Sequence, residues 1–162
     1  MVMRPLADPE KADFEAILEC VQSMSPARLS RLVAIMALYW LEYNPIDVHE
    51  VLTQIRTWLE LDPAHPGVKQ AQNLIELSLK QQPDLDALIS SCTERWSPKR
   101  ISPVIQNILR VALVEMTILR RDPALIINEA VELTKLLAED DAYRFVNGIL
   151  DHLHKQPLTE DT

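Results

Sequence analysis

Apolar side chains recur every three or four positions along most of this chain, the spacing that places them on one face of an α-helix. From Ile127 onward, apolar or small residues follow at i+3, i+4, i+7 and i+10, and a second stripe runs from Phe145 to Leu153. Stripes of the same kind occur within residues 14–21, 27–43, 48–61, 68–80, 84–96 and 104–120. Only two glycines are present, and alternating strand patterns are nearly absent. The pattern therefore predicts an all-α fold.

Proline-containing pairs mark where these helices begin and end. Ser25-Pro26 and Ser102-Pro103 are helix starts, because serine can cap the free backbone amides and proline suits the first helical position. Asn44-Pro45 ends a helix, since the residue before proline disfavours the helical conformation. These breaks predict an N-terminal extension helix within residues 1–24, a helical domain at 25–156 and a flexible polar tail at 157–162.

Composition limits the class of protein. With 162 residues and 48% hydrophobic content, the chain is long and apolar enough to build a core. No apolar run approaches the roughly 18 residues that span a bilayer, and residues 1–25 lack a signal-peptide pattern, so we expect a cytoplasmic protein without a membrane partner.

The net charge of -8 argues against a surface that attracts nucleic acid everywhere. The charges are, however, unevenly distributed. Residues 95–121 carry six basic side chains against one acid, Glu115, a local charge of +5; the basic residues are Arg95, Lys99, Arg100, Arg110, Arg120 and Arg121. A basic zone on an acidic body is therefore possible, with Lys99, Arg100, Arg120 and Arg121 as its candidate residues.

The helix predicted at 27–43 has one narrow polar sector. At 100° per residue, that sector holds Arg28, Arg31, Ile35, Tyr39 and Glu42, and almost every other position is apolar or small. Arginine beside tyrosine is the pairing that single-stranded RNA uses, because guanidinium groups bind phosphate and aromatic rings stack on bases. We interpret the sector as a candidate RNA-binding strip; the alternative is that the arginines only solvate the edge of a core helix.

No enzymatic chemistry is indicated. The sequence lacks a Ser-His-Asp or Cys-His arrangement, a glycine-rich phosphate loop and an HExxH motif. Its histidines and its two cysteines, Cys20 and Cys92, do not have metal-ligand spacing. We expect no catalytic residues, no metal and no cofactor.

Two short segments carry a resemblance to a known family. Residues 127–133 (INEAVEL) and 145–151 (FVNGILD) have the order and separation found in the NusB family, and residues 102–116 follow its pattern for the preceding helix. The resemblance covers roughly residues 26–155. It implies a fold of two packed antiparallel helical subdomains, at about 25–82 and 83–156, with about seven helices; the N-terminal helix is an addition here.

The resemblance also implies a function. NusB proteins are RNA-binding transcription antitermination factors that bind the boxA element of nascent RNA together with the ribosomal protein NusE, and so act indirectly on the RNA polymerase elongation complex. Aligned on the Ala-Leu-Tyr triplet at 37–39, Arg28 and Arg31 match family arginines, and Tyr39 matches a tyrosine used near RNA. Asp141 and Phe145 match the RNA-facing start of the last helix, although Phe145 also lies in the core stripe.

The sequence departs from the family pattern where RNA binding is concerned. Ala27 and Leu29 occupy positions that are often basic in the family, so half of the arginine cluster is missing. Two alternatives to the RNA-binding hypothesis follow. One is a protein-interaction scaffold of this fold that has lost most RNA binding; the other is a stand-alone relative of the NusB-like domain attached to rRNA cytosine methyltransferases.

Overall fold

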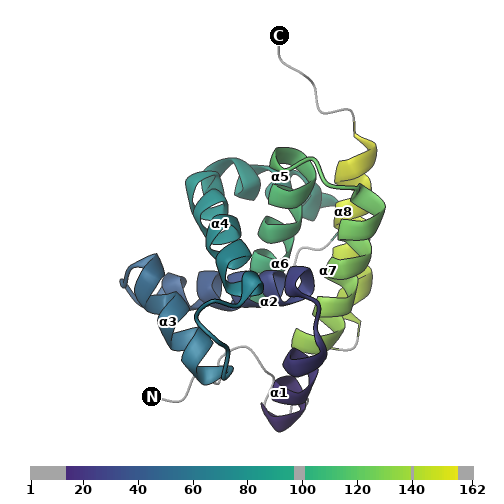
Figure 1. The fold of residues 1–162 in the computed structure, drawn as a ribbon. Coiled ribbons are helices and arrows are strands. Elements are labelled where there is room, and N and C mark those ends of the chain that lie inside the picture. Colours follow the sequence, from purple (N-terminus) through teal and green to yellow (C-terminus); the bar gives the residue numbers. More distant parts are fainter. Residues whose placement is uncertain (1–13, 97–100, 140, 157–162) are drawn as a thin grey trace.

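The computed structural model describes residues 14–96, 101–139 and 141–156, and within these ranges every regular element is helical (Figure 1). The predicted all-α fold is confirmed. Its elements are α1 (Phe14–Ser23), α2 (Pro26–Tyr43), α3 (Val48–Trp58), α4 (Pro66–Lys80), α5 (Gln82–Trp96), α6 (Pro103–Leu113), a π-helical segment η1 (Val114–Ile118), α7 (Pro123–Leu137) and α8 (Ala142–Lys155).

The helix starts follow from the capping residues. The Ser25 hydroxyl accepts a hydrogen bond from the Arg28 backbone amide at the start of α2, and the Ser102 hydroxyl accepts one from Ile105 at the start of α6. In both helices proline occupies the first turn, where its missing N–H costs nothing. Both starts predicted from Ser-Pro pairs are therefore confirmed.

Helix α2 is the centre of the molecule. It crosses the middle of Figure 1, and every residue from Leu29 to Leu38 is buried. Its most extensive packing is against α4, and it also contacts α3 and α6. The start of α4 can lie this close because of Gly67: a Cβ there would lie 3.1 Å from both the Leu29 side chain and the Pro26 carbonyl oxygen. Glycine at this position permits the close helix crossing.

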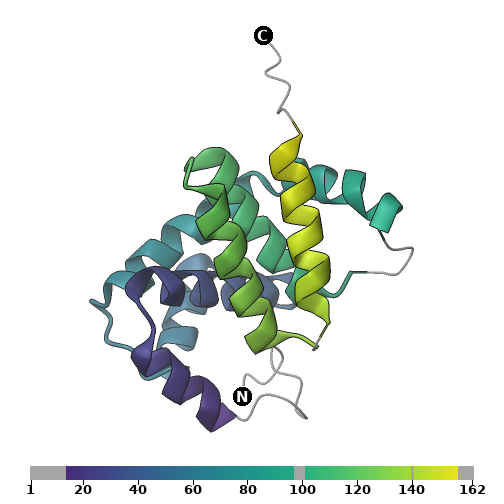
Figure 2. The same cartoon turned by 90° about the vertical axis from the view of Figure 1, so that its right-hand side faces the viewer.

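Helices α7 and α8 form the second large packing unit. They lie side by side in Figure 2, and α8 also contacts α5 and α6. Helix α6 contacts both α2 and α7, so it connects the two units. Helix α1 lies below α2 in both views and buries Ile17 and Val21 in the same hydrophobic cluster.

The helix predicted at 104–120 is not continuous, and that prediction is wrong at its end. The α-helical pattern stops at Leu113 and gives way to η1, where the Leu119 amide donates to the Val114 carbonyl at 3.0 Å. Arg120 then adopts a left-handed conformation with φ of 55°, which ends the helix. The wider turn of η1 carries Glu115 to a fully buried position.

Within the described residues, no helix combines the length and apolarity needed to cross a membrane.

Candidate nucleic-acid interface

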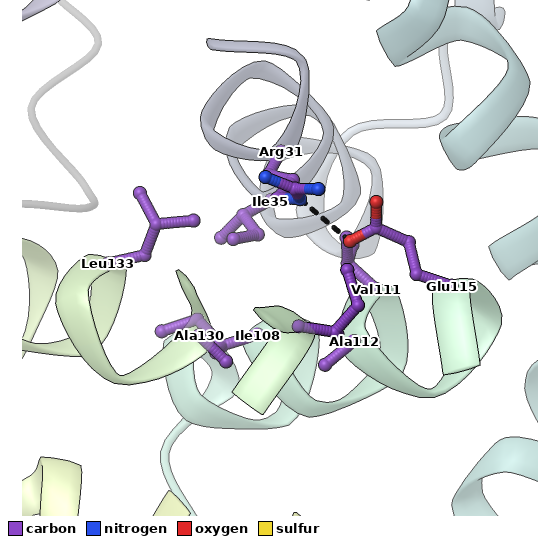
Figure 3. A pocket seen from close by; sticks show the side chains of 9 residues that line it. Arg31, Ile35, Ile108, Val111, Ala112, Glu115, Ala130 and Leu133 are labelled. Carbon is purple, nitrogen blue, oxygen red and sulfur yellow. Dashed lines mark hydrogen bonds and ion pairs between the residues drawn. The ribbon is translucent and has the colours of Figure 1, made fainter. Parts of the chain in front are cut away.

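Arg31 is not exposed, so the prediction of a continuous solvent-facing strip on α2 is wrong. Its Nε donates a hydrogen bond of 2.8 Å to Oε2 of Glu115 in η1, and the two side chains are only 8% and 1% exposed (Figure 3). Ile35, one turn further along the same face, is buried as well. The pair lies beside a cavity of about 10 Å³, room for at most about one water molecule, lined by α2, α6, η1 and α7. The middle of the expected strip is therefore covered by protein.

Arg28 remains at the surface but is already paired. Its Nε and Nη2 donate to the two carboxylate oxygens of Glu129 on α7, at 2.8 and 2.9 Å. The Arg28 side chain is 38% exposed and that of Glu129 12%. Glu129 also lies 3.5 Å from Nη1 of Arg31, so it faces both arginines of α2.

A third arginine completes this network. Arg121, just beyond η1, donates to the second carboxylate oxygen of Glu115. Arg28, Arg31 and Arg121 therefore share Glu115 and Glu129, so three positive and two negative charges leave a net charge of +1. The network joins α2, η1 and α7, and it explains why charged groups can be buried here: each buried charge has a partner.

Tyr39 lies at the other end of α2, separated from Arg28 by about 16 Å along the helix axis. It is partly buried and packed against the core, and its ring centroid lies 5.3 Å from that of the exposed Tyr43. Burial raises the pKa of Tyr39 above its ordinary value of 10.0. The structure therefore does not place Tyr39 beside the arginines, but gives it a second tyrosine as neighbour.

The basic zone predicted within residues 95–121 is only partly a surface. Arg110 is buried, and it donates to both carboxylate oxygens of Asp86 at 2.7 and 2.8 Å and to Glu42 at 2.7 Å. Arg110 thus connects α6 to α5 and α2 and contributes no free charge. Arg120 is exposed and Arg121 partly exposed, while Lys99 and Arg100 lie outside the described residues.

The start of α8 presents a group that the sequence did not single out. Asp141, before the first turn, is exposed, and Phe145 is partly buried against the core. Between them, the Tyr143 ring has the Lys135 ammonium 5.0 Å and the Arg144 guanidinium 5.8 Å from its centroid. In such an arrangement the two cations can bind phosphate and the aromatic ring can stack on a base. Tyr143 and Arg144 directly precede Phe145, but no sequence signal brings Lys135 from α7 to them.

The acids of the network were also missed, although the sequence holds a partial signal for them. Glu115 is the one acid within residues 95–121, and Glu129 belongs to the INEAVEL segment. A helix as apolar as α2 has little room for an exposed arginine, and a buried arginine requires a carboxylate partner. This rule indicates that a buried Arg31 needs a carboxylate partner, but it does not indicate which carboxylate that is.

Two carboxyl groups in these ion-pair networks, those of Glu129 and Asp86, make the free energy of unfolding depend on pH in the acid range. The hydrogen bonds from Arg28 lower the pKa of Glu129 below its ordinary 4.5; burial would raise the pKa of Asp86, but hydrogen bonds from Arg110 and Gln106 outweigh it and lower that pKa too. Since both folded-state pKa values lie below the ordinary values of 4.5 and 3.8, this stabilisation is present in full above about pH 5 and is lost progressively as the pH falls below those values.

We therefore expect the free energy of unfolding, measured in urea at a series of pH values, to decrease from pH 5 to 3. Arg28→Ala should make that decrease shallower, because it removes the cause of the Glu129 shift. Equal stability of the unmodified protein at pH 3 and pH 6 would contradict the assignment.

Among the described residues, no cluster of three or more histidine, cysteine, aspartate or glutamate side chains could hold a metal ion. What the described surface offers is guanidinium and ammonium groups: Lys135 and Arg144 lie near the Tyr143 ring, and Arg28 and Arg121 lie at the edge of the ion-pair network.

Comparisons with known proteins are consistent across sequence and structure. The NusB family profile matches residues 28–155, which leaves α1 outside the matched range. The transcription antitermination protein NusB of Elusimicrobium minutum is 33% identical over 138 residues, covering 82% of this chain and 96% of that protein. NusB of Oleidesulfovibrio alaskensis is 36% identical over 137 residues, covering 78% of this chain and 86% of the relative.

Solved structures agree. NusB of T. maritima superimposes with a TM-score of 0.69 at 31% identity, over 82% of this chain and 92% of that one. A crystal structure of the antitermination factors NusB and NusE in complex with dsRNA matches with a TM-score of 0.70 at 22% identity, over 82% of this chain and 98% of that one, and supports the fold alone. The chain belongs to the NusB family.

Proposed function

We propose that this protein is an RNA-binding transcription antitermination factor that binds boxA-like nascent RNA together with NusE and acts through it on elongating RNA polymerase. The observation that carries the proposal is the family match over residues 28–155, together with 33% identity to a transcription antitermination protein along almost its whole length. The role is non-enzymatic, and nascent bacterial RNA places it in the cytoplasm.

The RNA-facing groups proposed here lie in two places. Arg28 and the exposed Arg120 and Arg121 lie at the margins of the ion-pair network, while Lys135 and Arg144 surround Tyr143 at the start of α8. Tyr39, Asp141 and Phe145 keep the roles that the resemblance implies for them. Arg31 acts indirectly, by fixing α2 against η1.

The charge balance favours a protein partner. The network around Arg28 leaves only one positive charge in excess, and the whole chain carries -8, so RNA binding by this chain alone should be weak. An acidic surface is electrostatically complementary to a basic ribosomal protein, which then supplies further cations for RNA. NusE is the partner that satisfies this requirement.

A titration of labelled boxA-like single-stranded RNA, with and without NusE, tests the proposal. For two phosphate contacts we expect a slope of log affinity against log salt of about -1.4 for the chain alone. NusE should make binding both tighter and more salt-dependent, and double-stranded RNA of the same sequence should bind less well. If NusE binding is unchanged by RNA and neither RNA form binds, the proposal is wrong.

One structural observation favours a second candidate, a scaffold of this fold that binds protein partners without RNA. Arg31 is buried and Arg28 is neutralised by Glu129, so the α2 arginines are satisfied internally. Arg28→Ala separates the candidates because Arg28, unlike Arg31, is partly exposed. Under the scaffold alternative, NusE binding persists and no RNA-dependent property changes; under the RNA-binding proposal, RNA affinity falls in the NusE complex.

A further inference from the structure

One of the two bidentate edges of the Arg28 guanidinium is occupied by a carboxylate of the same chain. Guanidinium binds phosphate most strongly through two parallel N–H groups, as it does a carboxylate. In Arg28 the Nε and Nη2 groups that form such a pair both donate to Glu129, at 2.8 and 2.9 Å. Glu129 thus holds the position that a phosphate group would take.

The carboxylate of Glu129 is not the main partner of the buried charge nearby. Arg31 has its own hydrogen bond to Glu115, and Glu129 approaches it only to 3.5 Å without a hydrogen bond. The two direct hydrogen bonds of Glu129 go to the partly exposed Arg28. Because the Arg28 side chain is 38% exposed, its ion pair with Glu129 contributes only modestly to folding, and a phosphate group can take the place of the carboxylate at a modest cost.

We propose that Glu129 is an affinity-determining residue for RNA: it competes with an RNA phosphate for the bidentate edge of Arg28, so that phosphate binds there only by displacing the carboxylate. This inference rests on the proposed RNA-binding function and adds that a carboxylate of the chain itself competes with the RNA. The consequence is that the chain alone holds RNA more weakly, and with a smaller salt dependence, than its arginines allow.

Glu129→Gln tests the inference, since glutamine keeps the size of the side chain and removes the charge. With the labelled boxA-like single-stranded RNA, we expect about fivefold tighter binding, because the lost competitor is an ion pair of ordinary strength. The salt slope should steepen by about 0.7, the value of one additional phosphate contact. A purely structural role would leave that slope unchanged.

Two further variants serve as controls. Glu76→Gln removes the same charge from the exposed face of α4, where the partner of Glu76 is the uncharged Gln72 side chain, so it measures the effect of net charge alone. The double variant Arg28→Ala/Glu129→Gln should not show the gain in RNA affinity, because it lacks the guanidinium that Glu129→Gln frees. Thermal unfolding of each variant shows whether it is folded, so that RNA affinities are compared only among folded proteins.

If Glu129→Gln does not fold, Glu129→Asp provides the second measurement. Aspartate keeps the charge but is one methylene shorter, so it cannot form both bonds in the same place, and a smaller rise in affinity is expected. Unchanged or weaker RNA binding by the folded variants, while the unmodified protein binds, overturns the inference and leaves the proposed function intact. Absence of RNA binding by all of them, with and without NusE, overturns both.

Discussion

Replacing Glu115 by alanine is expected to lower the free energy of unfolding by about 3–5 kcal/mol, because the buried Arg31 guanidinium loses its hydrogen-bonded carboxylate and keeps only Glu129, 3.5 Å away, as a countercharge. The Arg31 side chain is only 8% exposed and cannot regain water without moving α2. Arg121, the other partner of Glu115, is partly exposed and can return to solvent. Urea unfolding of Glu115→Ala against the unmodified protein measures the loss.

A double variant separates lost charge from lost packing. Arg31→Met/Glu115→Leu replaces the buried pair by apolar side chains of similar length, and such replacements are often neutral or stabilising. We expect it to recover most of the stability that Glu115→Ala loses. If Glu115→Ala costs less than about 1 kcal/mol, the pair is not buried as the structure places it.

Arg110→Met is expected to lower the free energy of unfolding by about 2–3 kcal/mol. The substitution keeps the apolar stem but removes the charged hydrogen bonds from α6 to Asp86 on α5 and to Glu42 on α2. The expected loss is smaller than at Glu115 because both acids are about a third exposed and can be rehydrated.

Arg120→Met is the matched control for this experiment. It removes the same charge from the next stretch of chain, but Arg120 is exposed and no described side chain bonds to it, so its effect should stay within about 0.5 kcal/mol. Equal losses in the two variants would mean that net charge, and not the Arg110 contacts, sets the stability.

Local sequence rules were sufficient to locate the helices, although not the π-helical segment that follows α6. Apolar spacing located them, and the Ser-Pro pairs identified two of their starts, because capping depends on residues within one turn. Exposure of the α2 arginines could not be predicted in the same way. Periodicity shows that Arg31 lies on the polar side of its helix, but whether another helix covers that side depends on Glu115, which is 84 residues away.

The partners of the candidate RNA-binding residues could not be predicted for the same reason. Arg28 was correctly placed near the start of α2, but its partner Glu129 is 101 residues further along the chain. Lys135 meets Tyr143 through the packing of α7 on α8, which no short motif encodes. The family resemblance predicts an RNA-facing surface at the start of α8, whereas the cations around its aromatic ring became visible only in three dimensions.

The π-helical turn places a constraint on chain length as well as on residue type. A π-turn holds more residues than an α-turn, and one residue corresponds to about 100° of helix rotation. Deleting a single residue from Val114–Ile118 would therefore rotate the chain that follows relative to α6, and a deletion at Val114 would also turn Glu115 away from Arg31. This segment should tolerate many substitutions on its outer side but neither an insertion nor a deletion.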